Sequence, residues 1–323
     1  MPTAAAPPFG TSPDKPNNPC LIAILLCTYN GAEYLREQLD SFIRQTHWNW
    51  VAYASDDGST DGTLEILAEY QRALGERLVI LHGPRQGFAR NFISLICNPA
   101  VRGEYFAFSD QDDIWLQDKL ARGVTALRTV SHEVPALYCS RTELVDRSGR
   151  HLGFSPLFTK RPGLRNALVQ SLAGANTMLI NLRARELLRS TPEDAQIVAH
   201  DWLTYLIVSS YGGGIVYDPV PTLLYRQHGG NLIGSSTAIK SRLIRLSKTF
   251  CGHFSEWNEM NLKVLQQHKA CLGLEHRQLL EQFALARRSP LIKRLKLLLQ
   301  TRVYRQTFSG NVKLLVAALF KQL

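Results

Sequence analysis

The feature that most constrains this chain is an apolar stretch at 105–108 that leads directly into three carboxylates, Asp110, Asp112 and Asp113. The stretch, Tyr-Phe-Ala-Phe, predicts a short buried β-strand. Aspartate is rarely buried without a partner, so a buried strand that delivers three of them to its end needs positive charge there. Alternate side chains of a strand share a face, so Asp110 and Asp112 are expected to converge on one point.

Two explanations account for this cluster. A divalent cation such as Mg²⁺ or Mn²⁺ takes oxygen ligands and leaves positions open for phosphate oxygens, and it would supply the missing charge. The alternative is a solvated acidic turn that caps a helix beginning near Trp115, because aspartate is a favourable N-cap residue. Three carboxylates after an apolar strand favour the metal site.

The spacing of apolar runs predicts an α/β fold with a mostly parallel sheet. Helical patterns separate most of the predicted strands, as in βαβ units. These strands begin near residues 21, 50, 78, 105 and 137. Ligands of such sheets bind outside the carboxyl ends of the strands, and two acidic clusters fall there: 110–113 and 56–61. In the second cluster, carboxylates could accept hydrogen bonds from a ribose or a base, although Asp61 could simply cap the following helix.

Three motifs in this order resemble family 2 glycosyltransferases of the GT-A fold. They are Cys-Thr-Tyr-Asn-Gly at 27–31, Ser-Asp-Asp-Gly-Ser-Thr-Asp at 55–61, and Ser-Asp-Gln-Asp-Asp-Ile-Trp at 109–115. The resemblance extends from about residue 21 to about residue 234. It implies a GT-A (Rossmann-like) domain, a nucleoside-diphosphate sugar donor, a divalent metal and inversion at the anomeric carbon.

The resemblance also assigns residues. Donor binding falls on Thr28, Tyr29, Asp57 and Asp110, and the metal falls on Asp110 and Asp112, with Asp112 the principal ligand. The form of the third motif is similar to that of bacterial rhamnosyltransferases. This implies dTDP-L-rhamnose as donor and a cell-surface polysaccharide or lipid-linked saccharide as acceptor.

An inverting transfer by direct displacement needs a base that deprotonates the acceptor hydroxyl. Asp201 begins an apolar helical stretch within His-Asp-Trp at 200–202, where the family keeps its base aspartate. The family usually has a glutamate before that aspartate, and His200 replaces it here; the His-Asp-Trp form is also similar to the rhamnosyltransferases. Asp201 is therefore interpreted as the catalytic base, and the alternative is a helix N-cap.

The loop after residue 224 adds two weaker candidates. Arg226 is expected to contact a diphosphate, since arginine suits bidentate phosphate binding. His228 is expected to complete the metal site, although a lone histidine more often has a structural role. Asn231 lies in the same glycine-containing loop.

Charge is concentrated at the end of the chain. Nine of the net ten positive charges lie in 287–323, which contains no acidic residue. Within it, 291–299 predicts a basic amphipathic helix suited to an anionic membrane. A surface helix packed on the catalytic domain is the alternative. A nucleic-acid site is least favoured, because no nucleic-acid-binding fold accompanies the charge.

The remaining expectations concern organisation. Residues 1–19 predict a disordered leader, 20–235 the GT-A catalytic domain, and 236–323 a helical segment with the basic tail. Six scattered cysteines without a Cys-x-x-Cys pair indicate a reducing compartment. We therefore expect a cytoplasmic enzyme, peripheral on the cytoplasmic face of the inner membrane. The alternatives are a nucleotidyltransferase, which would normally have a glycine-rich basic loop near residue 28, and an inactive nucleotide-sugar-binding scaffold.

Overall fold

The computed structural model describes residues 19–192, 195–228 and 253–323. Its strands are β1 (Ile22–Thr28), β2 (Trp50–Asp56), β3 (Leu78–His82), β4 (Tyr105–Ser109), β5 (Ile114–Trp115), β6 (Ala136–Ser140), β7 (Glu143–Val145), β8 (His151–Phe154), β9 (Leu179–Asn181), β10 (Gly214–Asp218) and β11 (Leu223–Arg226). Its helices are α1 (Leu35–Ile43), α2 (Thr63–Leu74), α3 (Phe88–Cys97), α4 (Lys119–Leu127), α5 (Leu164–Ala167), α6 (Leu182–Arg189), α7 (His200–Ser210), α9 (His253–His268), α10 (Leu274–Arg288), α11 (Leu291–Thr301) and α12 (Phe308–Leu319), with short 3₁₀ turns at Gly75–Arg77, Ala175–Thr177 and Lys269–Cys271.

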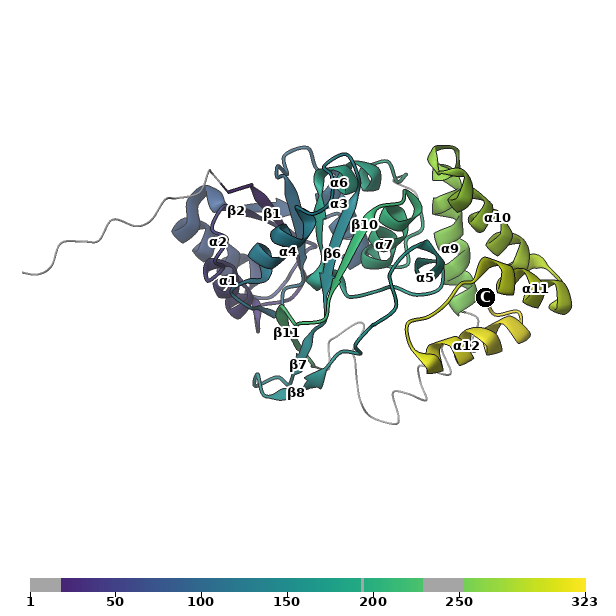
Figure 1. The fold of residues 1–323 in the computed structure, drawn as a ribbon. Coiled ribbons are helices and arrows are strands. Elements are labelled where there is room, and N and C mark those ends of the chain that lie inside the picture. Colours follow the sequence, from purple (N-terminus) through teal and green to yellow (C-terminus); the bar gives the residue numbers. More distant parts are fainter. Residues whose placement is uncertain (1–18, 193–194, 229–252) are drawn as a thin grey trace, which may run out of the picture.

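A seven-stranded sheet forms the centre of the molecule, in the order β10-β6-β9-β4-β1-β2-β3 (Figure 1). Its pairs are parallel except those of β9, which runs antiparallel to β4 and β6. A smaller sheet, in the order β5-β11-β7-β8, lies beside it. The register places Thr28 opposite Asp56 and Leu26 opposite Ser109, so three of the predicted motifs follow adjacent strand ends.

Helices cover both faces of the large sheet, and the strand sequences show why. Along β1, Ala23, Leu25 and Cys27 face one apolar core, whereas Ile22, Ile24 and Leu26 face the other. This two-residue alternation is that of a strand buried on both faces. Helices α3, α6 and α7 complete the first core, and α1, α2 and α4 complete the second.

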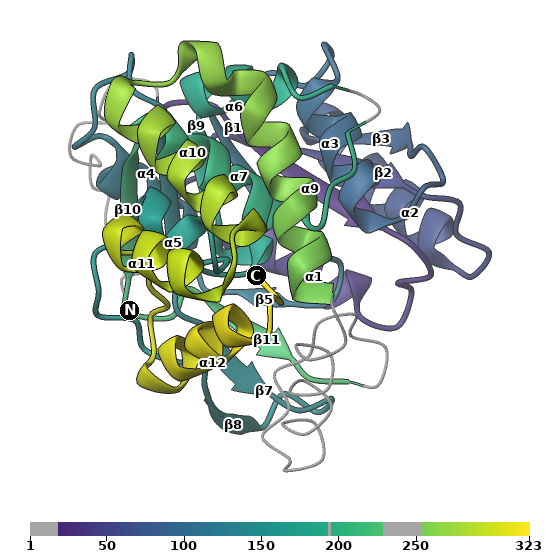
Figure 2. The same cartoon turned by 90° about the vertical axis from the view of Figure 1, so that its right-hand side faces the viewer.

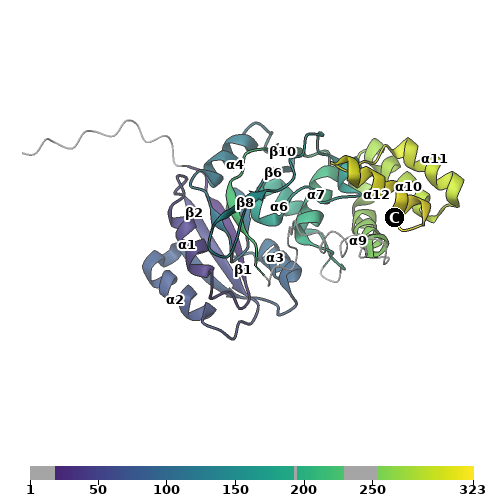
Figure 3. The same cartoon turned by 90° about the horizontal axis from the view of Figure 1, so that it is seen from below.

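The C-terminal helices α9 to α12 extend the first core rather than forming a separate one (Figures 2 and 3). Phe254, Leu265 and Phe283 are buried in the same apolar cluster as Leu206 of α7. Polar contacts add to this packing: Tyr304 N donates to Arg165 O, and His276 Nδ1 lies 2.8 Å from Ser210 O. The helical segment is therefore packed on the catalytic fold. None of the helices in the described residues is long and apolar enough to cross a bilayer.

The structure confirms the α/β prediction and the five predicted strand positions. It corrects the expected helix near Trp115, because Ile114 and Trp115 form β5, which pairs antiparallel with β11, and α4 begins only at Lys119. The carboxylates of 110–113 therefore do not cap a helix. The predicted leader, Asn231 and the predicted boundary at 235 lie outside the described residues, apart from Pro19. Among the described cysteines, Cys20, Cys27, Cys139 and Cys271 are free thiols.

Candidate active site

Asp56, the last residue of β2, organises the loop after that strand. Its carboxylate accepts hydrogen bonds from Thr28 Oγ1 at 2.8 Å, from Gly58 N and Ser59 N, and from Ser59 Oγ. Asp56 is buried, and these donors satisfy its charge without a cation. Thr28 is only 1% exposed. Its hydroxyl is bonded to Asp56 and supports the loop after β2, whereas a group that binds the donor directly would be expected to be accessible to solvent.

Asp57 is held by the segment that connects β3 to α3. Its two oxygens accept from Arg85 N at 2.6 Å and Gly87 N at 2.8 Å. Gly83 passes so close to this carboxylate that an added Cβ would lie 2.8 Å from Asp57 Oδ1. Each carboxylate oxygen has about two acceptor positions, so Asp57 keeps acceptor capacity for a ligand.

Gln111 fastens the first motif to the third. Its side-chain amide accepts from Tyr29 N at 2.9 Å and donates to Tyr29 O at 3.0 Å. Gly31 makes room for this side chain, because an added Cβ would lie 2.2 Å from Gln111 Oε1. The ring of Tyr29 remains 58% exposed at the carboxyl edge of the sheet.

Asp113 is the buried anchor of the third motif. It accepts from Asn176 Nδ2 at 2.5 Å and from Arg226 N at 3.4 Å, and its own N–H donates to Gln38 Oε1. Burial, followed by the negative charges of Asp112 and Asp110, raises its pKa well above the ordinary value. Asp113 therefore joins β4, β11 and the turn at 175–177 in one hydrogen-bonded junction.

Asp112 and His228 lie in direct contact, with His228 Nε2 2.7 Å from Asp112 Oδ2. Arg226 holds the same segment from behind: its Nε donates to Asp112 O, and its terminal nitrogens donate to Arg147 O and Glu37 Oε2. The guanidinium also stacks on the ring of Tyr34. Arg226 is only 2% exposed, and its guanidinium is bonded to the backbone of Asp112; its contact with a diphosphate stays a prediction.

Asp110 is the first carboxylate of the loop after β4. Burial raises its pKa to about 7, and the charges of Asp112 and Asp201 contribute to that rise. Asp112 follows in the same loop and Asp201 lies in the first turn of α7, so carboxylates of two segments act on Asp110. Like charges in close proximity disfavour ionisation unless a cation or a proton compensates them.

Asp201 is the second residue of α7, and Ala199 is the N-cap. Its Oδ1 accepts from Trp202 N at 2.6 Å, and Ser171 Oγ lies 3.4 Å from its Oδ2. Burial raises the pKa of Asp201 to about 6. The carboxylate is thus ionised at neutral pH and more basic than an ordinary aspartate, as a general base requires.

His200, the neighbour of Asp201, points into an aromatic cage. Its ring stacks on Phe92 with centroids 3.9 Å apart, and Phe88 and Phe108 pack at its other sides. Neither ring nitrogen has a hydrogen-bond partner within 19–192, 195–228 and 253–323. Burial lowers the pKa of His200 to about 3, so the imidazole is neutral and serves as an apolar support for the start of α7.

A divalent cation would be compatible with this donor set. Among the described residues, no group of three or more His, Cys, Asp or Glu side chains is arranged to hold a metal on its own. Mg²⁺, however, is commonly bound by one or two carboxylates together with substrate phosphates. Asp112 and Asp110 provide such carboxylates at a strand end, and His228 contacts the first of them.

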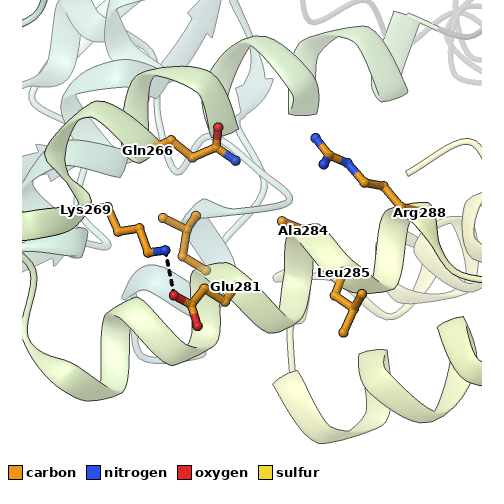
Figure 4. A pocket seen from close by; sticks show the side chains of 7 residues that line it. Gln266, Lys269, Glu281, Ala284, Leu285 and Arg288 are labelled. Atoms are coloured by element: carbon orange, nitrogen blue, oxygen red, sulfur yellow. Dashed lines mark ion pairs between the residues drawn. The ribbon is translucent and has the colours of Figure 1, made fainter.

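A groove of about 240 Å³ lies elsewhere, between α9 and α10 (Figure 4). Lys269 and Glu281 form an ion pair at 2.7 Å on its wall, and Arg288 lies at its other end. None of the predicted site residues lines this groove. It is not part of the carboxylate site.

Comparison with known proteins gives the family. The model of "Glycosyl transferase family 2" matches residues 23–180. The chain is 32% identical over 232 residues to a dTDP-rhamnosyl transferase, RfbG, of Shigella flexneri, which covers 68% of this chain and 78% of that protein. The chain belongs to glycosyl transferase family 2. It is therefore a glycosyltransferase, as the sequence motifs indicated.

Solved structures show the same fold. The glycosyltransferase TarS of S. aureus in complex with UDP-GlcNAc aligns with a TM-score of 0.53 at 16% identity, over 93% of this chain and 88% of that one. The mannosyltransferase PcManGT of Pyrobaculum calidifontis, in complex with GDP-Man and Mn²⁺, aligns with a TM-score of 0.50 at 16% identity, over 98% and 91%. The fold of this glycosyltransferase is thus GT-A.

Sequence reasoning placed the carboxylates at the correct edge but missed their supports. Gln111, Asn176 and Glu37 were not candidates, and no structural role was assigned to Asp56. One signal was available: in Ser-Asp-Gln-Asp-Asp, an amide stands among carboxylates, next to a first motif that ends in glycine. Such an amide can serve a backbone segment as both donor and acceptor.

The Gln111–Tyr29 contact leads to a first prediction. Gln111→Ala removes both hydrogen bonds and should weaken binding of the nucleoside-diphosphate donor about fivefold or more, since each such bond contributes about 0.5–1.5 kcal/mol. The effect should appear in donor KM more than in kcat, because Tyr29 is expected to contact the nucleoside. Gln117→Ala, which truncates an exposed glutamine after the same motif, is the matched control. Equal donor KM values for the two variants would contradict a positioning role for Gln111.

Proposed function

We propose that this glycosyltransferase transfers L-rhamnose from dTDP-L-rhamnose to a hydroxyl of a cell-surface polysaccharide or lipid-linked saccharide, with inversion. The donor is suggested by the similarity to the dTDP-rhamnosyl transferase of Shigella flexneri and by the shared motif forms. The observation that carries the proposal is the register that places Thr28, Asp56 and Ser109 at adjacent strand ends, with Asp112 of the same edge in contact with His228. No observation favours a nucleotidyltransferase or an inactive scaffold.

For the donor, we propose that Asp57 and Tyr29 contact the nucleoside and that Asp110 and Asp112 lie at the diphosphate. Asp57 retains acceptor positions, and the ring of Tyr29 is exposed beside it. Thr28 and Arg226 would act indirectly, by positioning other residues. Thr28 bonds Asp56, and Arg226 holds the carbonyl of Asp112. Both were expected to touch the donor, and we propose positioning roles for them because they are buried.

Asp112 and Asp110 would hold Mg²⁺ or Mn²⁺, with His228 bonded to the first of them. When bound, the cation would neutralise negative charge on the departing diphosphate. Arg226 would keep Asp112 oriented from the buried side. The mannosyltransferase of the same fold that contains Mn²⁺ supports this role for a divalent metal.

Asp201 would take the proton of the acceptor hydroxyl as that oxygen attacks the anomeric carbon from the face opposite the diphosphate. The bond from the anomeric carbon to the diphosphate breaks, and the diphosphate leaves with its electron pair. The backbone N–H of Trp202 would fix the orientation of the carboxylate. The neutral, apolar His200 would keep water away from that side of α7.

We propose a cytoplasmic location, peripheral on the inner membrane, because a lipid-linked acceptor lies at that surface. The basic tail supports this proposal with fewer charges than its composition suggests. Arg287 is paired with Glu259, Arg294 is buried and bonded to Ala318 O, and Arg305 lies over the ring of Phe254. Six cations remain exposed or partly exposed: Arg288, which also lies 3.7 Å from Glu259, and Lys293, Lys296, Arg302, Lys313 and Lys321.

A donor panel tests the function. Purified protein is incubated with dTDP-L-rhamnose, UDP-GlcNAc and GDP-mannose, and release of the nucleoside diphosphate is measured with and without a saccharide acceptor. We expect release from dTDP-L-rhamnose to exceed that from the others. Preference for another sugar nucleotide would refute dTDP-L-rhamnose as the donor but not the glycosyltransferase activity. Release of pyrophosphate from a nucleoside triphosphate would contradict the proposed reaction class.

The metal site is tested by Asp112→Asn, which keeps a hydrogen-bond acceptor for His228 but removes the charge. We expect turnover to fall by at least about 10²-fold, the usual scale for loss of one charge-stabilising group. Mn²⁺ binding in the presence of dTDP, measured by electron paramagnetic resonance, should weaken in parallel. Asp118→Asn, an exposed carboxylate after the same motif, should match the wild type. Full wild-type activity in excess EDTA would refute metal dependence.

Asp201→Asn tests the base. Asparagine keeps the shape of the side chain and can still accept from Trp202 N, but it cannot take a proton. The base role predicts a loss in kcat of roughly 10²–10⁴-fold, with donor Kd nearly unchanged. In the wild type, the rate should fall as the pH drops below about 6, because Asp201 then becomes protonated. Glu186→Gln, on the exposed side of α6, is the control and should match the wild type. A wild-type kcat for Asp201→Asn would show that Asp201 is not the catalytic base.

A further inference from the structure

Helix α12 carries apolar residues on two opposite sides. Leu314, Ala317 and Ala318 are buried against the first core. The other side carries an exposed stripe, spaced four, three and four residues apart, which places its members on one face of the helix. This α12 stripe consists of Phe308, Val312, Leu315 and Leu319.

The exposure of the α12 stripe is large. Phe308 is 85% exposed and Leu315 is 55% exposed, and Phe320 continues the exposed apolar surface at the end of the helix. Helix α11, which is joined to α12 by the bond from Arg294 to Ala318 O, also exposes Ile292 and Leu299. A row of exposed apolar side chains along one helix face is typical of a surface that binds a partner or a membrane.

The charge around the stripe distinguishes between possible partners. The stretch 287–323 carries the six surface cations and contains no Asp or Glu. A second copy placed on the same face would bring two positively charged 287–323 segments together, and like charges across an interface oppose association. An anionic bilayer offers lipid chains for the stripe and negative headgroups for the lysines.

We propose that the α12 stripe inserts into the headgroup–acyl boundary of an anionic membrane, with α12 lying along the surface. The helix has 12 residues and is therefore about 18 Å long, too short to span a bilayer but suitable for an interfacial helix. This inference rests on the proposed membrane location. It assigns the apolar contact to α12, whereas the sequence pattern had placed the membrane contact on 291–299.

The test uses the full chain and vesicles of phosphatidylcholine with 30% phosphatidylglycerol, or of phosphatidylcholine alone, measured by flotation. The double variant Phe308→Ser with Leu315→Ser removes most of the exposed stripe. We expect its partitioning to anionic vesicles to fall about tenfold or more. Leu274→Ser with Leu285→Ser, two exposed leucines of α10, should bind as the wild type does. Donor turnover with a soluble acceptor should be unchanged in both, which also shows that they fold.

The outcomes separate the proposals. If the wild type does not bind anionic vesicles, the membrane location fails, while donor turnover still tests the glycosyltransferase function. If the wild type binds and the α12 variant binds equally well, the inserted stripe is refuted and the location survives. If sedimentation shows a wild-type dimer that the α12 variant loses, the stripe is an interface between copies and the proposal is overturned.

Discussion

The buried carboxylate of Asp113 is the interaction on which the site depends. It lies in the turn between β4 and β5 with no exposed surface, so its hydrogen bonds must come from the protein. Asn176 and the backbone of Arg226 provide them, and these belong to segments more than sixty residues away in the chain. Once Arg226 is fixed, its guanidinium reaches back to the carbonyl of Asp112. One buried carboxyl group is thus linked, through Arg226, to the backbone of the adjacent Asp112.

The aspartates of this enzyme differ in role because they differ in surroundings. Asp56 and Asp113 accept hydrogen bonds from other segments of the protein and hold loops in place. Burial raises the pKa of Asp110 to about 7 and that of Asp201 to about 6, and it raises the pKa of Asp113 well above the ordinary value. Perturbed pKa values cluster at functional sites, but buried structural carboxylates share them, so the bonding partners must distinguish the two kinds. Asp112 and Asp113 can thus differ in role although they are adjacent, since Asp113 is fully buried and Asp112 is not.

The C-terminal helices join the catalytic fold to a second surface. Their inner sides share the core of α7, the helix that carries Asp201, so they cannot be regarded as a detachable tail. Their outer sides combine apolar and basic residues. Arg287 and Arg294, which look like surface charges in the sequence, bind Glu259 and Ala318 O and tie these helices together. Charge count alone therefore overstates what the tail presents to a partner.

The sequence by itself determined the sheet and the edge at which the site lies. Strand periodicity is local, and parallel strands with crossover helices place their carboxyl ends together, so the motifs at 28, 56 and 110 had to meet. Only the tertiary structure decided which of the motif side chains are buried. Thr28 and Arg226 were expected at the donor but are buried, because their partners Asp56 and Asp112 lie on other segments. Burial and the partners of a buried group depend on contacts distant in the chain, and no local pattern specifies them.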